Sequence, residues 1–150
     1  MTAGTTSVVG VDRLELASRL RLIVARLARR LRQQASSGLS PSQLTALASI
    51  HKAGPMTLGT LAEIERVAPP TITKVVDKLT EAGLVERSVD PSDRRFVLVA
   101  ATAAGKATID KIRAERNAWL SARLDALSPE DVERLALAVD ALAALAEDET

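Results

Sequence analysis

Residues 57–99 have the sequence TLGTLAEIERVAPPTITKVVDKLTEAGLVERSVDPSDRRFVLV. Along this stretch the spacing of apolar residues changes from that of helices to that of strands, and this change decides the predicted fold. Thr57 caps a short helix, and after a tight turn a second helix is predicted from Pro69 to Ala82. The β-prone runs 84–87 and 96–99 then flank a polar connection, which predicts a hairpin. Two helices joined by a tight turn and followed by a hairpin indicate a helix-turn-helix with a β wing.

The second of these helices is predicted to turn a polar face outward. If its apolar positions point inward, the outward arc holds Pro70, Thr73, Lys74, Asp77 and Glu81, with Thr71 and Lys78 on its flanks. In a helix-turn-helix, the leading residues of the second helix enter the major groove of DNA. Hydroxyl and ammonium groups there can bond base edges and phosphates. Taken alone, an ordinary amphipathic helix with a solvated face is the simpler interpretation.

The hairpin connection, 90–95, places two adjacent arginines at its tip. Arg94 or Arg95 could enter a narrow minor groove, where the negative potential of DNA is enhanced. Asp93 could hold a neighbouring guanidinium in one orientation through a bidentate pair. A polar turn with an incidental ion pair is the alternative. Because this connection follows directly after the helix-turn-helix, the DNA-binding interpretation is favoured.

Further helices are predicted on both sides of residues 40–99. Apolar residues recur at helical spacing within 12–36 and again within 102–147. We expect one domain over 1–150, mainly α with a small β-hairpin wing (α+β), in which 40–99 form the winged helix. The flanking stripes are long for a core of this size, which favours dimerisation. For any one helix, completion of an intramolecular bundle is an equally good interpretation.

Composition excludes several classes of function. The 150 residues include no Cys and a single His, His51, which excludes disulfides, thiol chemistry and Cys-based metal sites. No apolar run approaches the ~20 residues of a membrane span. Residues 1–10 lack the profile of a secretion signal, so a cytoplasmic location is expected. No catalytic set stands out, and we expect neither an enzyme nor a cofactor or metal.

Charge is distributed unevenly although its sum is small. The net charge of +1 does not by itself indicate a nucleic-acid partner. Residues 1–39 carry seven arginines and two acidic residues, whereas residues 100–150 carry six basic and ten acidic ones. The two ends of the chain therefore have complementary charge.

The segments 75–87 (VVDKLTEAGLVER), 90–95 (DPSDRR) and 101–105 (ATAAG) together resemble the MarR family of winged-helix transcription regulators. The resemblance extends over nearly the whole chain, since flanking helices before and after the winged helix are also the family's arrangement. It implies a homodimer that binds a palindromic operator in double-stranded DNA. It also implies that the protein is a repressor relieved by a small, often phenolic or anionic, ligand.

The resemblance further implies which residues contact DNA. The positions that correspond to base-reading ones are Pro70, Thr71, Thr73 and Lys74, with Lys78 beside them. The wing arginine that enters the minor groove corresponds to Arg94, with Asp93 and Arg95 supporting it or reaching phosphate. Two departures stand out: 68–70 (APP) replaces the more usual polar cap, which leaves base preference open, and Ala101 replaces the usual Leu.

A ligand pocket is expected where the flanking helices meet the winged helix. Arg19 and Arg26 of the first helix could hold an anionic ligand there, although solvation or pairing with the acidic last helix is the simpler interpretation. The absence of Cys and the single His argue against peroxide sensing and metal sensing. The alternative to a DNA-binding regulator is a winged-helix protein-interaction module without a DNA ligand, which the balanced charge of 40–99 allows.

Overall fold

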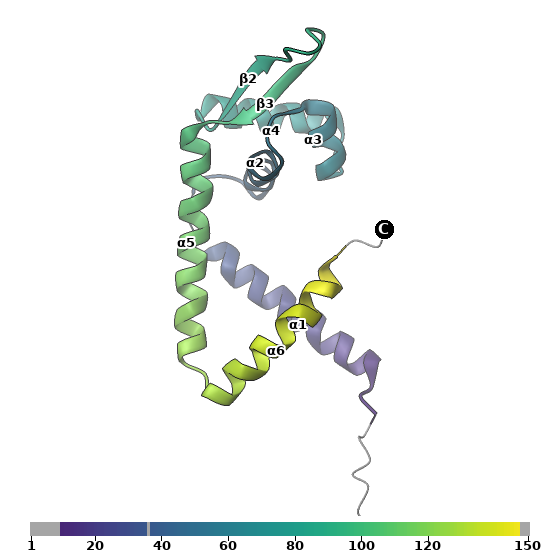
Figure 1. Ribbon diagram of the computed structural model, residues 1–150, viewed down its shortest axis with the longest axis vertical. Coiled ribbons are helices and arrows are strands. Elements are labelled where there is room, and N and C mark those ends of the chain that lie inside the picture. The colour runs from purple at the N-terminus through teal and green to yellow at the C-terminus, as the bar shows by residue number, and fades with distance from the viewer. Residues whose placement is uncertain (1–9, 36, 148–150) are drawn as a thin grey trace, which may run out of the picture.

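The computed structural model describes residues 10–35 and 37–147 (Figure 1). Its elements are α1 (Arg13–Gln33), α2 (Pro41–Ala53), β1 (Met56–Thr57), α3 (Leu58–Glu65), α4 (Pro69–Glu81), β2 (Val85–Val89), β3 (Val97–Ala101), α5 (Ala103–Asp125) and α6 (Pro129–Ala146). The predicted mainly helical fold with a small β wing is confirmed. Of residues 1–10, for which the sequence predicts no secretion signal, only Gly10 lies within the described part.

The elements form a head and an extension. Helices α2, α3 and α4 and the sheet make the head, and the β2–β3 hairpin projects from it (Figure 1). Helix α5 starts at the head and runs away from it, and α1 and α6 lie below the head (Figure 1). The candidate DNA-contacting segments α4 and the wing therefore belong to one compact unit.

Local capping explains where most helices begin. Side-chain oxygens of Ser40, Thr57, Thr102 and Ser128 accept hydrogen bonds from backbone N–H groups in the first turns of α2, α3, α5 and α6. At α2 the cap is reciprocal, because Gln43 Oε1 also accepts from the Ser40 N–H at 3.1 Å. Pro41 occupies the first position of α2, where a missing N–H costs nothing. The start of α3 at its Thr57 cap is the one predicted from the sequence.

The sheet has three strands, where the sequence predicts only a two-stranded hairpin. Its order is β1-β3-β2, and both pairs are antiparallel. The additional strand, β1, pairs Met56 with Val99 and Thr57 with Leu98. Two residues are too few to show an alternating pattern, and Thr57 was interpreted only as a helix cap. The predicted hairpin is present as β2 and β3, and β1 was missed because its pairing is set by residues about 40 positions away.

The hydrophobic core lies in the head. The largest fully buried side chains are Leu47, Ile50, Leu61, Ile72, Leu79, Val76 and Val99, which come from α2, α3, α4 and β3. Ile109 joins α5 to this core, and Ile112 is buried about one turn further along the helix. Burial of such side chains contributes roughly 1.5–3 kcal/mol each to folding. The head therefore has a complete core within one chain.

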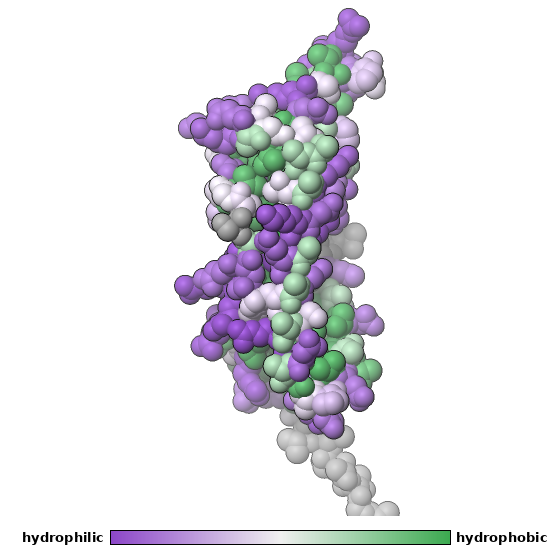
Figure 2. All heavy atoms as spheres, turned by 90° about the vertical axis from the view of Figure 1, so that its left-hand side faces the viewer, coloured by the Kyte–Doolittle hydropathy of each residue, from purple (hydrophilic) through white to green (hydrophobic). Residues whose placement is uncertain are grey.

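The helices α1 and α6 keep their apolar residues exposed. Neither contains a buried residue. Exposed large apolar side chains on them are Leu14, Leu16, Leu22, Ile23, Val24, Leu27, Leu135, Leu137, Val139, Leu142 and Leu145. In Figure 2, green hydrophobic residues reach the surface in the lower half of the molecule, between purple hydrophilic ones. No described helix is long and apolar enough to cross a membrane.

Candidate nucleic-acid interface

Helix α4 has one buried face and one face exposed to solvent. Ile72, Val76 and Leu79 are buried against the head. Val75, which the sequence places fully inside, is only partly buried. Among the candidate contact residues, Pro70, Thr71, Lys74 and Lys78 are exposed, and Thr73 and Asp77 are half-buried. The exposed set begins at the first turn of the helix, as a major-groove contact requires.

The first turn of α4 offers almost no backbone donors. Its N-cap, Ala68, makes no side-chain cap, and Pro69 and Pro70 have no N–H. The N–H groups of Thr71 and Ile72 both donate to the Ala68 carbonyl, at 2.9 and 3.2 Å. A helix N-terminus usually binds phosphate through free N–H groups. This helix start therefore lacks the free N–H groups that usually bind phosphate.

The polar side chains of α4 differ in what they can still bind. The Thr73 hydroxyl donates to the Pro69 carbonyl at 2.9 Å, so only its lone pairs remain. Lys78 forms an exposed ion pair with Glu81, with 3.2 Å between Nζ and Oε2. Neither the Thr71 hydroxyl nor the Lys74 ammonium has a hydrogen-bond partner within residues 10–35 and 37–147. Thr71 and Lys74 are thus the most available donors on this face.

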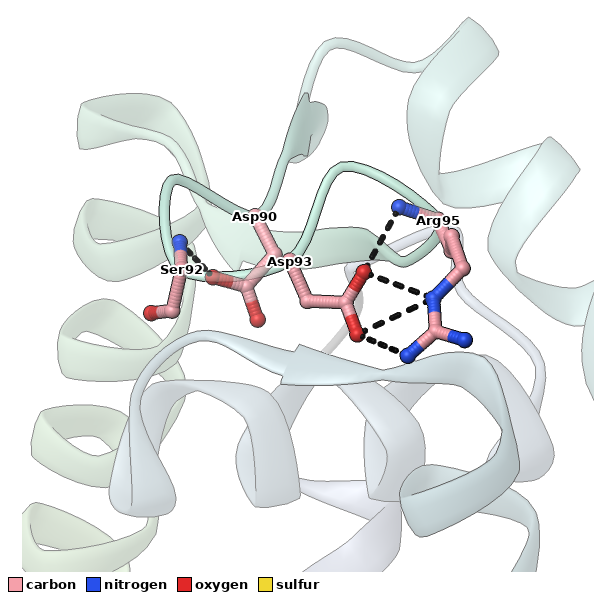
Figure 3. Close-up of polar contacts among 4 residues, drawn as sticks. All are labelled: Asp90, Ser92, Asp93 and Arg95. Atoms are coloured by element: carbon pink, nitrogen blue, oxygen red, sulfur yellow. Dashed lines mark hydrogen bonds and ion pairs between the residues drawn. The ribbon is translucent and has the colours of Figure 1, made fainter.

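The wing tip is closed by its own hydrogen bonds (Figure 3). The Asp90 N–H donates to the Phe96 carbonyl at 2.9 Å, and the Phe96 N–H donates to the Asp93 carbonyl at 3.0 Å. The Asp90 carboxylate accepts from the Ser92 N–H at 2.8 Å. The connection therefore has a defined shape although it lies beyond the core.

Asp93 holds Arg95 in place (Figure 3). Arg95 Nε lies 2.9 Å from Asp93 Oδ1, and Nη2 lies 2.7 Å from Oδ2. The same carboxylate accepts from the Arg95 N–H at 3.1 Å. The guanidinium also lies 5.9 Å from the centre of the Phe96 ring. The sequence leaves open which arginine Asp93 braces, and in the structure it is Arg95.

This ion pair shifts both ionisation equilibria. The Arg95 side chain lowers the pKa of Asp93, and the Asp93 carboxylate raises the pKa of Arg95. A lowered carboxyl pKa stabilises the folded wing at a pH above the usual value near 3.9, and this contribution is lost as the pH falls below it. The Asp93 carboxylate is therefore ionised and available to pair with Arg95 near neutral pH.

Arg94 differs from its neighbour. It is exposed, and its guanidinium has no hydrogen-bond or ion-pair partner in the described part of the chain. The wing thus carries one arginine held by a carboxylate and one that projects without a protein partner.

An ion pair that the sequence does not indicate joins α4 to the wing. Arg87 Nη2 on β2 lies 2.6 Å from Asp77 Oδ1 on α4, and both side chains are about half exposed. The two residues are on different elements, so no helical or strand spacing could reveal the contact. The pair neutralises the acid on the outward face of α4 and fixes β2 relative to the helix.

The predicted ligand residues Arg19 and Arg26 are not brought to the junction with the head. They line separate surface hollows of about 290 and 490 Å³, which are formed only by α1 and the residues just before it. Instead, Arg32, Arg113 and Arg116 meet where α1, α2 and α5 converge. They line two adjoining cavities of about 590 and 460 Å³, which share Arg32 and Arg116.

Comparisons with known proteins agree with this architecture. The MarR family model matches residues 39–97. An uncharacterised HTH-type transcriptional regulator of Mycobacterium bovis is 41% identical over 134 residues, covering 89% of this chain and 94% of the relative. The HTH-type transcriptional repressor MdtR of Bacillus subtilis is 31% identical over 110 residues, covering 73% and 71%. The structure of a MarR family protein from Bacillus stearothermophilus superposes with a TM-score of 0.74 and 27% identity, covering 87% and 91%.

The winged head, with its open recognition helix and arginine-tipped hairpin, defines the class of HTH-type transcriptional regulators. Within that class, the chain belongs to the MarR family. The family and the relatives are regulators and not enzymes. Members of this family bind DNA and are typically dimers.

Breaking the Asp77–Arg87 pair should weaken DNA binding more than folding. We expect Arg87→Ala to reduce affinity for DNA about three- to tenfold. The wing loses its ion pair with α4, and the unpaired Asp77 carboxylate repels the phosphates of bound DNA. The loss of stability should stay below about 1 kcal/mol, since the pair is exposed. Fluorescence anisotropy with a labelled duplex measures the first quantity and thermal unfolding the second.

The double variant Asp77→Asn/Arg87→Ala separates two explanations. Removal of the unpaired carboxylate should restore part of the affinity that Arg87→Ala loses. A double variant no tighter than the single one would show that the unpaired Asp77 carboxylate does not cause the loss, which would then come from Arg87 itself.

Proposed function

We propose that this protein is a homodimeric repressor that binds a palindromic operator through α4 and the wing. The main support for the proposal is that three side-chain hydrogen-bond donors of the head have no partner among the described residues: Thr71 and Lys74 on α4, and Arg94 on the wing. Similarity to the repressor MdtR supports the sign of regulation.

In this proposal the contact residues of α4 and of the wing bind two different grooves of the DNA. Thr71 and Lys74 meet base edges in the major groove, with Pro70, Thr73 and Lys78 beside them. Arg94 enters the adjacent minor groove. Asp93 keeps Arg95 close to the wing tip, where its remaining donors can reach phosphate.

The exposed apolar residues of α1 and α6 support the dimer. Ile23 and Val139 lie on the apolar stripes of α1 and α6, yet they are 56% and 57% exposed in the single chain. Packing of these stripes across a twofold axis would remove them from water and place two heads side by side. Two recognition helices related in this way reach half-sites about 10 base pairs apart.

The test of DNA binding is its dependence on salt. If about six phosphates are neutralised, affinity for duplex DNA should fall on the order of 10³-fold between 50 and 200 mM salt. Anisotropy titrations at several salt concentrations measure the slope, and light scattering measures the mass of the free protein. Absence of duplex binding at 50 mM salt would favour the protein-interaction module.

We also propose that a small anionic ligand relieves repression by binding at the α1–α2–α5 junction. Arg32, Arg113 and Arg116 converge there without an acidic partner in the described part of the chain. The Nε of Arg116 is buried and has no hydrogen-bond partner among the described residues. A carboxylate would satisfy this donor, and the junction joins the head to the helices assigned to the dimer.

Arg116→Ala should therefore abolish the ligand response while leaving ligand-free DNA binding within about twofold of wild type. Benzoate and related aromatic carboxylates serve as probes. The sole tryptophan, Trp119, lies one helical turn from Arg116 and reports binding by fluorescence. Arg26→Ala on the α1 surface is the matched control. A response lost in Arg26→Ala but kept in Arg116→Ala would place the ligand on α1 instead.

A further inference from the structure

The turn between α3 and α4 holds an arginine in a backbone conformation that favours glycine. Arg66 has φ 54° and ψ 44°, in the left-handed region. Within the described ranges, every other residue with positive φ is a glycine: Gly38, Gly54 and Gly83. A side chain at such a position is strained by contact of its Cβ with the backbone. Arg66 therefore carries a cost that glycine would avoid.

The turn itself does not need the arginine side chain. The end of α3 is closed by backbone bonds, from the Arg66 N–H to the Glu63 carbonyl at 3.2 Å and from the Val67 N–H to the Ala62 carbonyl at 3.1 Å. This is the arrangement in which glycine is usually found. The adjacent acid, Glu65, accepts a hydrogen bond from the Ser49 hydroxyl. The exposed Arg66 guanidinium has no hydrogen-bond or ion-pair partner in 10–35 or 37–147.

The position of Arg66 suggests what the side chain does. It precedes Pro69, the first residue of α4, by three positions, so their Cα atoms are at most about 11 Å apart. Residues 69–72 offer no free backbone N–H, which removes the usual phosphate contact of a helix N-terminus. A long cationic side chain next to this turn can replace that contact with a bidentate one.

We propose that Arg66 is a DNA-contacting residue that binds a backbone phosphate at the amino end of the recognition helix. This inference rests on the proposed DNA-binding function. The contact is to phosphate, so it contributes to affinity and register and does not read bases.

Arg66→Gly gives a test with two readouts of opposite sign. The unfolding midpoint should rise by about 2–4 °C, because glycine relieves the strained backbone. Affinity for duplex DNA should fall about three- to tenfold, and the slope of log affinity against log salt should decrease in magnitude by about 1. Arg66→Lys should keep most of the affinity and the wild-type salt slope. Arg134→Ala on α6 removes one positive charge away from the head and should change neither.

The outcomes separate this inference from the function on which it rests. If wild type binds DNA and Arg66→Gly binds with the same affinity and salt slope, the phosphate contact is wrong and the repressor proposal stands. If Arg66→Gly lowers the unfolding midpoint, the turn needs the arginine and the inference is overturned. If wild type binds no duplex, both proposals fail together.

Discussion

Replacement of Arg94 by alanine should weaken operator binding about tenfold to hundredfold, or by ~1.4–2.7 kcal/mol, and leave the unfolding midpoint unchanged. The side chain is exposed and has no protein partner in the described part of the chain, so its loss removes nothing from the fold. On DNA, its guanidinium would be desolvated in the enhanced negative potential of a narrow minor groove. Anisotropy titration with a fixed duplex measures the affinity.

Two further variants test whether the loss of affinity is specific to the Arg94 guanidinium. Arg94→Lys keeps the charge but not the planar fork, so it should recover only part of the affinity. Arg134→Ala removes an arginine that pairs with Asp131 on α6, and it should bind like wild type. If Arg94→Ala also bound like wild type, the assignment of the wing to the minor groove would be wrong.

Gly105→Ala should be the most destabilising single-methyl change in the head, costing ~1–3 kcal/mol. A Cβ at Gly105 would lie 2.1 Å from the Leu84 carbonyl oxygen and 3.3 Å from Leu47 Cδ1. The carbonyl cannot move freely, because it accepts a hydrogen bond from the Thr102 N–H at 3.0 Å. The start of α5 and the entry to β2 would have to separate. Thermal unfolding should show a midpoint about 2–10 °C lower.

Gly59→Ala is the matched control, because Gly59 also lies in a helix. Its added Cβ would meet only the Thr57 hydroxyl, at 3.9 Å. Since alanine is the better helix former, this variant should be as stable as wild type or more stable by up to about 1 kcal/mol. Equal effects of the two substitutions would contradict the close approach of α5 to residue 84.

Much of the fold follows from signals that are local in the sequence. Four helices begin where a side chain accepts a hydrogen bond from the N–H three residues ahead: Ser40, Thr57, Thr102 and Ser128. Both strands of the hairpin begin one residue later than expected, at Val85 and Val97, and each ends two residues later. Such boundaries depend on pairing partners and are less well determined by the sequence.

The remaining features depend on contacts between distant elements. Strand β1 exists because it pairs with β3, and the Asp77–Arg87 contact exists because the sheet packs beside α4. The sequence restricts the partner of Asp93 to a neighbouring arginine, but only the shape of the turn selects Arg95. The arginine cluster at the α1–α2–α5 junction comes from two separate helices, so the sequence directs attention to Arg19 and Arg26 instead.

Sequence and structure support the proposed DNA contacts in different ways. The sequence identifies Thr71, Lys74 and Arg94 by residue type and resemblance, and the structure leaves these three exposed on the head. Thr73 differs, because its hydroxyl hydrogen is used within α4. We therefore expect Thr73 to contribute less to base contacts than Thr71.

Selection of bound duplexes from a random DNA pool tests the central claim most directly. The 150-residue protein is incubated with the pool at low salt, and bound sequences are amplified and sequenced over several rounds. We predict enrichment of an inverted repeat whose half-site centres lie about 10 base pairs apart. Arg94→Ala, run in parallel, should enrich the same repeat more weakly. Bound pools that stay random, or that enrich only single unpaired half-sites, would contradict a dimer reading a palindrome through α4 and the wing.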